Sequence, residues 1–335
     1  MSRSCILLAL LYGLSAAPIA RAEPPCAEQC KKFVEEGELR DDVSPVGCFV
    51  RVCQREARKF YEKHEFKKAL ESLDYVQEHL DRSPSYQMER GLNYYALGRF
   101  DKALAAYEKV LKGFPNNVRT RSQRGHTLVR LGRLEDAQKQ FESLFADPLT
   151  EDEFKGLRTR SYLMSNIGVI KLLQGDVEGG KAALEQGLEL DGRNRPARSY
   201  LTDVVPYMES GDLTPKGAMR LLVAYEELSF GRHDSGAKEL RELLERSPRF
   251  RPGYFRVAEV LMATQQYEEC VETLEDGEKA LPDDIDLRAE RLRCSLLQLG
   301  PNTDKARPSL EEVKSLAKAH PENQRLQQIL TAMEQ

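Results

Sequence analysis

Apolar residues recur along most of the chain in short amphipathic segments, which end at glycine or proline. The segment Gly98–Ala103 returns in altered form as Gly132–Ala137, so the pattern repeats after 34 residues. In both copies the glycine is suited to end one helix, and the residues after it place apolar side chains on one face of a second helix. The pattern predicts a series of helical hairpins, each of which needs neighbours to cover its apolar face.

Residues 84–117 carry this unit most completely. Gly91 and Ala103 are small enough to let two helices approach closely, and Pro115 ends the second helix. In these residues the chain resembles the tetratricopeptide repeat family. The resemblance implies an all-α fold, a right-handed α-solenoid of helix-turn-helix repeats, over most of the chain. It implies little about activity, because this fold serves many unrelated partners.

The period also predicts the domain organisation. We expect repeats 1–4 over residues 50–194 and repeats 5–7 over residues 217–335, where a capping helix closes the stack. Residues 195–216 break the period, since Pro206 interrupts the single helix that would fit there. This segment is predicted to be a lone irregular helix or a degenerate half repeat, and to act as a hinge between two sub-stacks if its packing is weak.

Two residues depart from the repeat pattern. His64 stands where a repeat has its turn glycine. Gly180 replaces the usual alanine of a second helix, and we expect it to loosen that helix because glycine has the most backbone freedom to lose.

Residues 1–22 have the pattern of a secretory signal peptide. Arg3 supplies the positive start, Ile6–Leu14 the apolar stretch, and Ala20 and Ala22 the small residues before the cleavage site. Cleavage after Ala22 and a periplasmic or secreted location are therefore predicted. A membrane anchor is the alternative, but this apolar stretch is far shorter than the roughly 20 residues that span a bilayer.

A cysteine-rich helical segment is predicted over residues 23–49. Cys26, Cys30 and Cys48 lie in this segment, and Cys53 follows it. An even number of cysteines in an oxidising compartment favours disulfides. In an antiparallel helical hairpin, Cys26 with Cys53 and Cys30 with Cys48 would nest, although four cysteines permit three pairings. A zinc ion on the four thiolates is the alternative.

Cys270 and Cys294 are expected to come together further along the chain. Cys270 occupies the small position of a second helix, and Cys294 lies on the first helix of the next repeat. Neighbouring repeats pack these helices together. A disulfide and two buried thiols both fit this placement.

The sequence contains no recognisable catalytic constellation. The five histidines are isolated from one another, and no glycine-rich phosphate loop is present. We therefore predict a non-enzymatic protein without a metal ion or cofactor. A net charge of −4 gives no reason to expect a nucleic-acid partner. The oligomeric state stays open.

The family resemblance also suggests a binding surface, because first helices of these repeats line a concave face. Its residues here would be Arg58, Tyr61, Tyr95, Arg119, His126 and Arg130 in the first three repeats, followed by Tyr162, Tyr225, Phe255 and Met262. Gln54 and Arg58 stand where the family's best-known peptide clamp needs Lys and Asn, so that specificity is not carried over.

This surface is expected to have a basic first part and an apolar later part. Five arginines crowd one repeat of the first part, on faces expected to be solvated: Arg119, Arg121, Arg124, Arg130 and Arg133. They favour a carboxylate or an acidic segment of a partner. The later part would suit an apolar peptide, unless the helix around 197–209 or the C-terminal cap covers it.

The predicted function is that of a scaffold, which binds a partner protein or peptide during envelope assembly in the periplasm or outside the cell. The alternative is a glycan-binding or enzyme-activating accessory subunit of a cell-wall complex.

Overall fold

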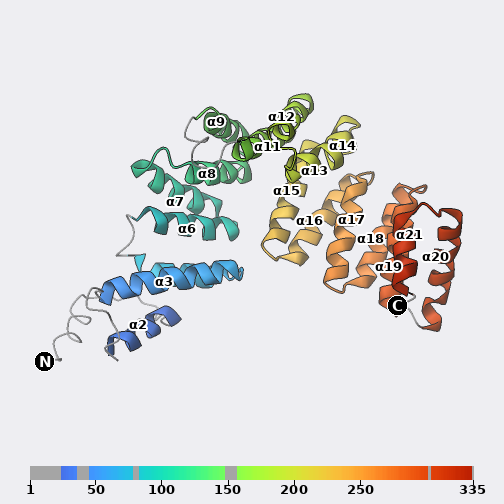
Figure 1. Ribbon diagram of the computed structural model, residues 1–335, viewed down its shortest axis with the longest axis horizontal. Helices are drawn as coiled ribbons and strands as arrows, with labels where there is room; N and C mark the ends of the chain where they lie inside the picture. The colour runs from blue at the N-terminus through green and yellow to red at the C-terminus, as the bar shows by residue number, and fades with distance from the viewer. Residues whose placement is uncertain (1–23, 36–44, 78–82, 148–156, 301–302, 334–335) are drawn as a thin grey trace. The chain divides into compact units, whose positions relative to one another are not determined.

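The computed structural model describes residues 24–35, 45–77, 83–147, 157–300 and 303–333 (Figure 1). The predicted signal peptide, residues 1–22, lies outside these ranges. All regular elements in the described ranges are helices, as the repeat pattern predicts. The chain divides into two compact units, Met1–Asn93 and Tyr94–Gln335, each of which is described by itself.

The first unit is a short helical array. Its elements are α2 (Pro25–Glu35), α3 (Pro45–Glu62), α4 (Phe66–Tyr75) and most of α6 (Pro84–Ala96). The helix α3 begins at Pro45, before the predicted start of the first repeat at residue 50, and proline is favoured in a first turn because no N–H is lost there. The core of this unit is a cluster of buried residues, among them Cys26, Cys53, Ala57, Leu73 and Tyr86.

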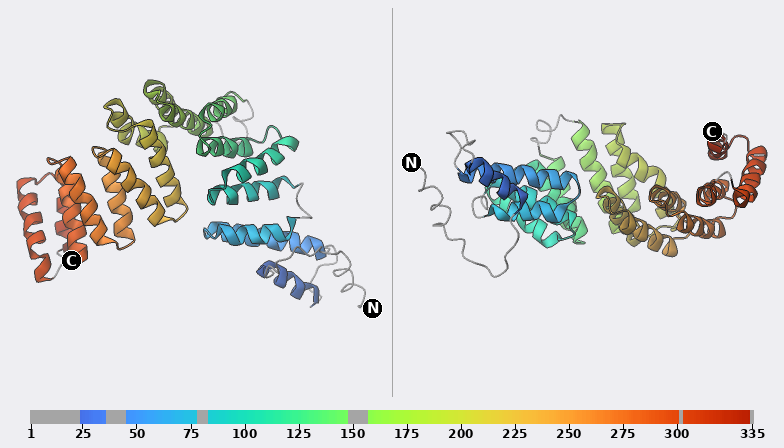
Figure 2. Two further views of the ribbon diagram at one scale, coloured as in Figure 1. Left: turned by 180° about the vertical axis from the view of Figure 1, so that it is seen from behind. Right: turned by 90° about the horizontal axis from the view of Figure 1, so that it is seen from below.

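The second unit contains the remaining helices. After the end of α6 they are α7 (Phe100–Gly113), α8 (Val118–Arg130), α9 (Leu134–Phe145), α11 (Leu157–Gln174), α12 (Val177–Leu190), α13 (Arg195–Asp203), α14 (Val205–Glu209), α15 (Pro215–Ser229), α16 (His233–Arg246), α17 (Arg251–Ala263), α18 (Tyr267–Ala280), α19 (Ile285–Leu299), α20 (Arg307–Ala319) and α21 (Gln324–Met333). Helices α8 and α9, α11 and α12, α15 and α16, and α17 and α18 pack as successive pairs (Figures 1 and 2). The predicted helical hairpins are therefore present.

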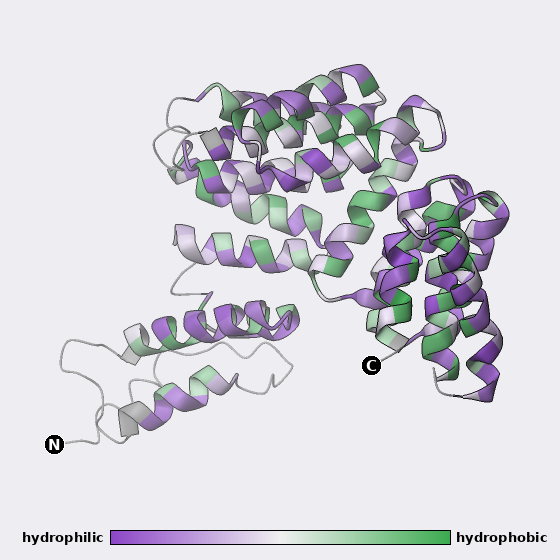
Figure 3. Cartoon of the chain, turned by 45° about the vertical axis from the view of Figure 1, so that its right-hand side comes forward, coloured by the Kyte–Doolittle hydropathy of each residue, from purple (hydrophilic) through white to green (hydrophobic). Residues whose placement is uncertain are grey.

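Most of the described helices have an apolar face and a polar face, whereas α11 is buried around most of its circumference. In Figure 3 hydrophobic and hydrophilic residues alternate along the helices, which is typical of amphipathic helices. Most of the apolar faces in the second unit join one core cluster, which runs from Val118 to Cys294. A smaller cluster, with Leu292 and Leu326 among its members, closes the C-terminal end as the predicted cap.

The turn inside a repeat uses a left-handed residue. Glycine holds this conformation at positions 98, 132, 175 and 231, with φ between 70° and 88°. His64 and Gln265 hold it with φ of 60°, so His64 does stand in the turn position. The N–H of the following residue then bonds a carbonyl five residues back, as from Gln266 to Leu261 at 2.8 Å, and this ends the first helix.

The start of a repeat uses a side-chain cap. Asn117, Asn194 and Asp284 each accept a hydrogen bond from the backbone N–H three residues later, at 2.9, 3.0 and 3.1 Å. Such a cap satisfies an N–H that has no partner within the helix. Asn194 is almost fully buried and also donates to the hydroxyls of Ser161 and Ser165, both at 2.7 Å. It therefore ties the start of α13 to α11.

Gly180 tightens its helix pair, so the expectation that it loosens the helix was wrong. A Cβ added to Gly180 would lie 2.7 Å from a methyl carbon of Leu172 and 3.0 Å from the carbonyl oxygen of Gly168. A Cβ on Gly168 would in turn meet the Gly180 carbonyl at 2.9 Å. The missing side chains let α11 and α12 cross at close range.

Residues 195–216 contain two short helices, α13 and α14, instead of one irregular helix. Val204 separates the two helices, since it follows the end of α13 and precedes the start of α14. Pro206 lies in the first turn of α14, where its ring is tolerated. Ala197, Val205 and Leu213 belong to the same core cluster as the helices on either side. The condition for a hinge, weak packing of this segment, is therefore not met.

The nested cysteine hairpin is present, but only its outer pair is bonded. Cys26 and Cys53 form a disulfide between α2 and α3, with a sulfur–sulfur distance of 2.08 Å. Cys30 and Cys48 are buried free thiols with sulfurs 2.7 Å apart, so the predicted second bridge is not formed. Burial, together with the neighbouring Cys48, raises the pKa of the Cys30 thiol. The thiolate that disulfide exchange requires is therefore disfavoured.

A second disulfide joins Cys270 of α18 to Cys294 of α19, with α-carbons 6.0 Å apart. Both residues are completely buried. The expected pairing across neighbouring repeats is therefore confirmed. Of the two alternatives, a disulfide and two buried thiols, the structure contains the disulfide. The bridge between Cys26 and Cys53 also removes two of the four thiolates that the zinc alternative needs.

Candidate protein-binding surface

The residues expected to bind a partner fall into three groups according to their surroundings. Arg58, Arg119 and Tyr162 expose a large part of their side chains. Tyr61, Tyr95, His126 and Arg130 make buried or partly buried contacts inside the chain. Tyr225, Phe255 and Met262 are half-buried against the core.

The first group offers side chains to a partner. Arg119 is exposed at the start of α8 and has no ion-pair partner among the described residues. Tyr162 of α11 is 38% exposed. It is one of three large hydrophobic residues that are exposed in the described part of the chain. In the first unit, Arg58 is 60% exposed although it pairs with Glu89 at 2.6 Å. Close to it in sequence, Tyr61 packs its ring edge-on against Phe66 with centroids 5.3 Å apart.

His126 lies inside the chain. Its ring packs against Phe141, with centroids 5.1 Å apart. Burial lowers the pKa of His126 to about 4, because a charged ring loses its hydration there. His126 is therefore neutral at neutral pH, and its partly buried ring contributes to packing.

Arg130 does not lie on a solvated face, contrary to the prediction. Its side chain is 13% exposed, and its guanidinium donates to the carboxylate of Glu226. The hydroxyl of Tyr95 donates to the other oxygen of the same carboxylate at 2.6 Å. Burial, and after it the charge of Glu226, raises the pKa of Tyr95, so the hydroxyl keeps its proton. Two predicted binding residues therefore hold a carboxylate of this chain.

Further contacts surround this carboxylate. The Arg232 guanidinium donates to the backbone carbonyl of Ala96 at 2.7 Å and to Glu227, also at 2.7 Å. The ring of Phe230 lies 6.5 Å from that of Tyr95. We call these contacts between 95–130 and 226–232 the Glu226 clasp. It joins the C-terminal ends of α6 and α8 to the end of α15.

The clasp could not be predicted from the sequence. Glu226 lies 131 residues from Tyr95 and 96 from Arg130, whereas a repeat pattern indicates only which neighbouring helices pack together. The sequence around Glu226 and Glu227 is that of an ordinary polar helix face.

The other crowded arginines are mostly paired within the chain. Arg121 bonds Asp147 at 2.5 Å, Arg124 donates to Gln140 at 2.9 Å, and Arg133 pairs with Asp136 at 2.6 Å. Of the five arginines, Arg119 alone has no such contact among the described residues. The expected basic surface is therefore much smaller than the arginine count indicates.

The residues expected in the later part, Tyr225, Phe255 and Met262, are half-buried, which agrees with the alternative that this part is covered. The guanidinium groups of Arg251 and Arg325 lie 4.7 and 4.3 Å from the centroid of the Phe255 ring. Arg256 lies over the ring of Tyr225 at 5.9 Å, and Met262 packs against the core cluster. Cation–π contacts of this kind stabilise an arginine over an aromatic face. Arg325 belongs to the C-terminal helix α21, so the alternative that the C-terminal cap covers the later part applies to the Phe255 ring.

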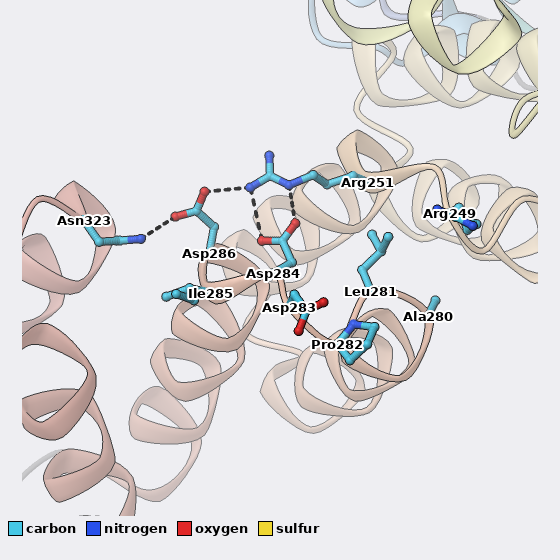
Figure 4. A pocket seen from close by; sticks show the side chains of 10 residues that line it. All are labelled: Arg249, Arg251, Ala280, Leu281, Pro282, Asp283, Asp284, Ile285, Asp286 and Asn323. Carbon is cyan, nitrogen blue, oxygen red and sulfur yellow. Dashed lines mark hydrogen bonds and ion pairs between the residues drawn. The ribbon is translucent and has the colours of Figure 1, made fainter. Parts of the chain in front are cut away.

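A pocket of about 620 Å³ lies near these residues, at the turns that precede α17, α19 and α21 (Figure 4). In it Arg251 donates to Asp284 at 3.2 Å and to Asp286 at 2.6 Å, and Asn323 donates to Asp286 at 2.8 Å. Asp284, followed by Asp286, raises the pKa of Arg251 through these contacts. The polar groups satisfy one another, so the network fixes three helix starts.

The described residues contain no group of three or more His, Cys, Asp or Glu side chains placed to hold a metal ion. Crossing a bilayer also requires a longer and more apolar helix than any of those described.

Comparisons with known proteins agree with the repeat pattern. Tetratricopeptide repeat models match residues 55–118 and 94–160. No curated protein matches the chain. Among solved structures, the chain is similar to PilW, a widely conserved type IV pilus biogenesis factor, with 15% identity, a TM-score of 0.39 and coverage of 84% of this chain and 97% of that one.

It is also similar to a tetratricopeptide repeat protein from Parabacteroides merdae, with 15% identity, a TM-score of 0.39, and coverage of 86% of this chain and 99% of that one. The TPR2AB domain of yeast Sti1, solved in complex with pHSP90, has 14% identity, a TM-score of 0.33, and coverage of 75% and 98%. Values this low carry no inference about activity. The two models together cover residues 55–160, which contain the 34-residue unit, so this part of the chain consists of tetratricopeptide repeats.

Proposed function

We propose that the chain is an exported, non-enzymatic scaffold that binds a partner protein during envelope assembly. Tetratricopeptide repeats generally serve protein–protein interaction, and their helices present side chains along an extended stack. The observation that carries the proposal is the combination of such repeats with two disulfide bonds, Cys26–Cys53 and Cys270–Cys294. Disulfides persist in oxidising compartments, which agrees with the signal-like sequence of residues 1–22.

The binding residues that we propose are those whose side chains are available. Arg119 and Tyr162 lie on the first helices of two repeats, and Arg58 lies on that of an earlier one. An exposed guanidinium and an exposed aromatic ring are the side-chain types most enriched at interface hot spots. They would contact a partner without any rearrangement of this chain.

The experiment is affinity capture from an envelope fraction, with the tagged full chain expressed in the organism that encodes it. The parent chain should begin at Glu23 and should recover a stoichiometric protein, identified by mass spectrometry. The double variant Arg119→Glu/Tyr162→Ala should recover much less of it, whereas Lys112→Glu, an exposed charge reversal on a second helix, should recover the parental amount.

Two results would contradict the proposal. Recovery from the cytosol with Met1 intact would exclude export. Retention on insoluble cell wall without a protein partner would favour the alternative, a glycan-binding accessory subunit of a cell-wall complex. An enzyme recovered in complex and activated by the chain would favour the enzyme-activating form of that alternative.

A further inference from the structure

Three side chains around the Glu226 clasp hold one another in place. The rings of Tyr95, at the end of α6, and Phe100, at the start of α7, meet edge-on with centroids 5.4 Å apart. The guanidinium of Arg130, at the end of α8, lies 4.5 Å from the Phe100 centroid. These three residues come from consecutive helices and need nothing from α15 for their arrangement. The hydroxyl and the guanidinium are therefore donors that are already positioned.

A carboxylate fits between these donors. Glu226 uses one oxygen to accept from Tyr95 at 2.6 Å and the other to accept from Arg130. Charge-assisted hydrogen bonds of this kind are about twice as strong as neutral ones, and partial burial strengthens them further. Tyr95 is 9% exposed, and the Glu226 side chain is 21% exposed. The site thus selects a carboxylate and keeps most of the water away from it.

The rest of the clasp is suited to opening. Besides the two bonds to Glu226, the Arg232 guanidinium donates to the Ala96 carbonyl at 2.7 Å and the Phe230 ring lies 6.5 Å from that of Tyr95. Polar contacts at a partly exposed site are weakened by salt and exchange with water. The helix α15 packs on α16 and α11 independently of the clasp. Glu226 can therefore leave the site without unfolding its helix.

We propose that Tyr95 and Arg130 form a binding site for an aspartate or glutamate side chain of the partner protein, and that Glu226 occupies this site as an internal competitor. This inference rests on the proposed protein-binding function. A partner segment rich in acidic residues would displace Glu226 and open the clasp. Affinity for that segment would be reduced by the fraction of molecules in which the clasp is closed.

The probe is hexaglutamate peptide, titrated by calorimetry at low salt into the purified, disulfide-bonded chain. Glu226→Ala empties the site, so it should bind the peptide at least about tenfold more tightly than the parent, because an internal competitor acts at a millimolar effective concentration. Adding Arg130→Gln to that variant should remove the gain. Glu278→Ala is the matched control, since Glu278 pairs with Arg291 at similar exposure in the same unit.

Two further variants guard against a misfolded protein. Glu226→Gln keeps the shape of the side chain and removes its charge, so it should also bind hexaglutamate more tightly than the parent. Tyr95→Phe removes one donor and should weaken binding in the Glu226→Ala background. Circular dichroism and thermal unfolding establish that each variant is folded.

The inference is overturned if folded Glu226→Ala or Glu226→Gln binds the peptide no more tightly than the parent, or if Glu278→Ala gives the same gain. It is also overturned if Arg130→Gln leaves the gain intact, or if no variant binds. These outcomes leave the proposed scaffold function standing, because capture of a partner by the parent chain is measured separately.

Discussion

Two repeat turns of the described chain hold a non-glycine residue in the left-handed backbone region. Gln265 has φ of 60° at the position where the preceding turn, in the repeat before it, has Gly231. An L-residue with a side chain pays about 1–2 kcal/mol for this conformation, and glycine does not. The turn is therefore weaker at Gln265 than at a glycine.

We predict that Gln265→Gly raises the free energy of unfolding by about 1 kcal/mol. Urea unfolding followed by circular dichroism measures it. The control is Gln266→Gly, where φ is −90° and glycine only adds backbone freedom to the unfolded chain, so stability should fall. Equal effects of the two substitutions would mean that the left-handed turn carries no cost.

Gly180 should behave in the opposite way, because its missing Cβ makes room for Leu172 and for the Gly168 carbonyl. Gly180→Ala should lower the free energy of unfolding by about 1–3 kcal/mol, although alanine is the better helix former by about 1 kcal/mol. Gly113→Ala, in a helix with open space around the position, should leave stability unchanged or raise it slightly. Stabilisation by Gly180→Ala would show that α11 and α12 do not cross this closely.

His126 should make stability depend on pH. Its pKa in the folded chain is about 4, below the ordinary value of 6.5, so between these values the unfolded chain binds the proton more readily. The contribution is fully present above pH 6.5 and falls as the pH drops toward 4. Relative to pH 7, we expect the parent to lose about 2 kcal/mol more than His126→Phe at pH 5. The free energy of unfolding is measured in urea at both pH values. If the parent and His126→Phe lose the same free energy between pH 7 and pH 5, the burial of this ring is contradicted.

At the scale of helices and their connections, the repeat pattern was a reliable guide. Gly98 and Gly132 predicted two turns, and both glycines hold the left-handed turn conformation. These features depend on residues close in sequence. Gly180 was misread because a glycine in a helix has the same sequence signature whether it marks flexibility or a close contact. The sequence also predicted that Cys30 and Cys48 lie next to each other. Whether they form a bond depends on the protonation of the two buried thiols, which the sequence pattern does not indicate.

The cysteine pairing gives a prediction for the connected helices. Peptide mapping of the mature chain, alkylated under denaturing and non-reducing conditions, should find Cys26 linked to Cys53 and Cys270 linked to Cys294. Cys30 and Cys48 should carry the alkyl label, because both thiols are buried and free. A bridge between Cys30 and Cys48 would contradict their free-thiol state, whereas labelling of all cysteines would contradict the packing of α2 against α3 and of α18 against α19.

At the scale of the second unit, the Glu226 clasp connects helices that are far apart along the chain. A 34-residue period relates each helix to its neighbours and carries no information about residues about 100 positions away. The sequence therefore predicted Tyr95 and Arg130 as residues that bind a partner, and their contact with Glu226 could not be predicted. The choice left open for the later part depends on a similar long-range contact: Arg325 of the C-terminal helix α21, 70 residues further along, lies over the Phe255 ring.

The central claim is that the Glu226 carboxylate is held by Arg130 across the second unit. A double-mutant cycle with Arg130→Gln, Glu226→Gln and the combined variant tests it most directly, with the free energy of unfolding measured in urea at low salt. Both side chains are largely shielded, at 13% and 21% exposed, so we predict a coupling free energy of about 1–3 kcal/mol that decreases at high salt. Additive effects of the two substitutions, with no coupling at low salt, would contradict the clasp.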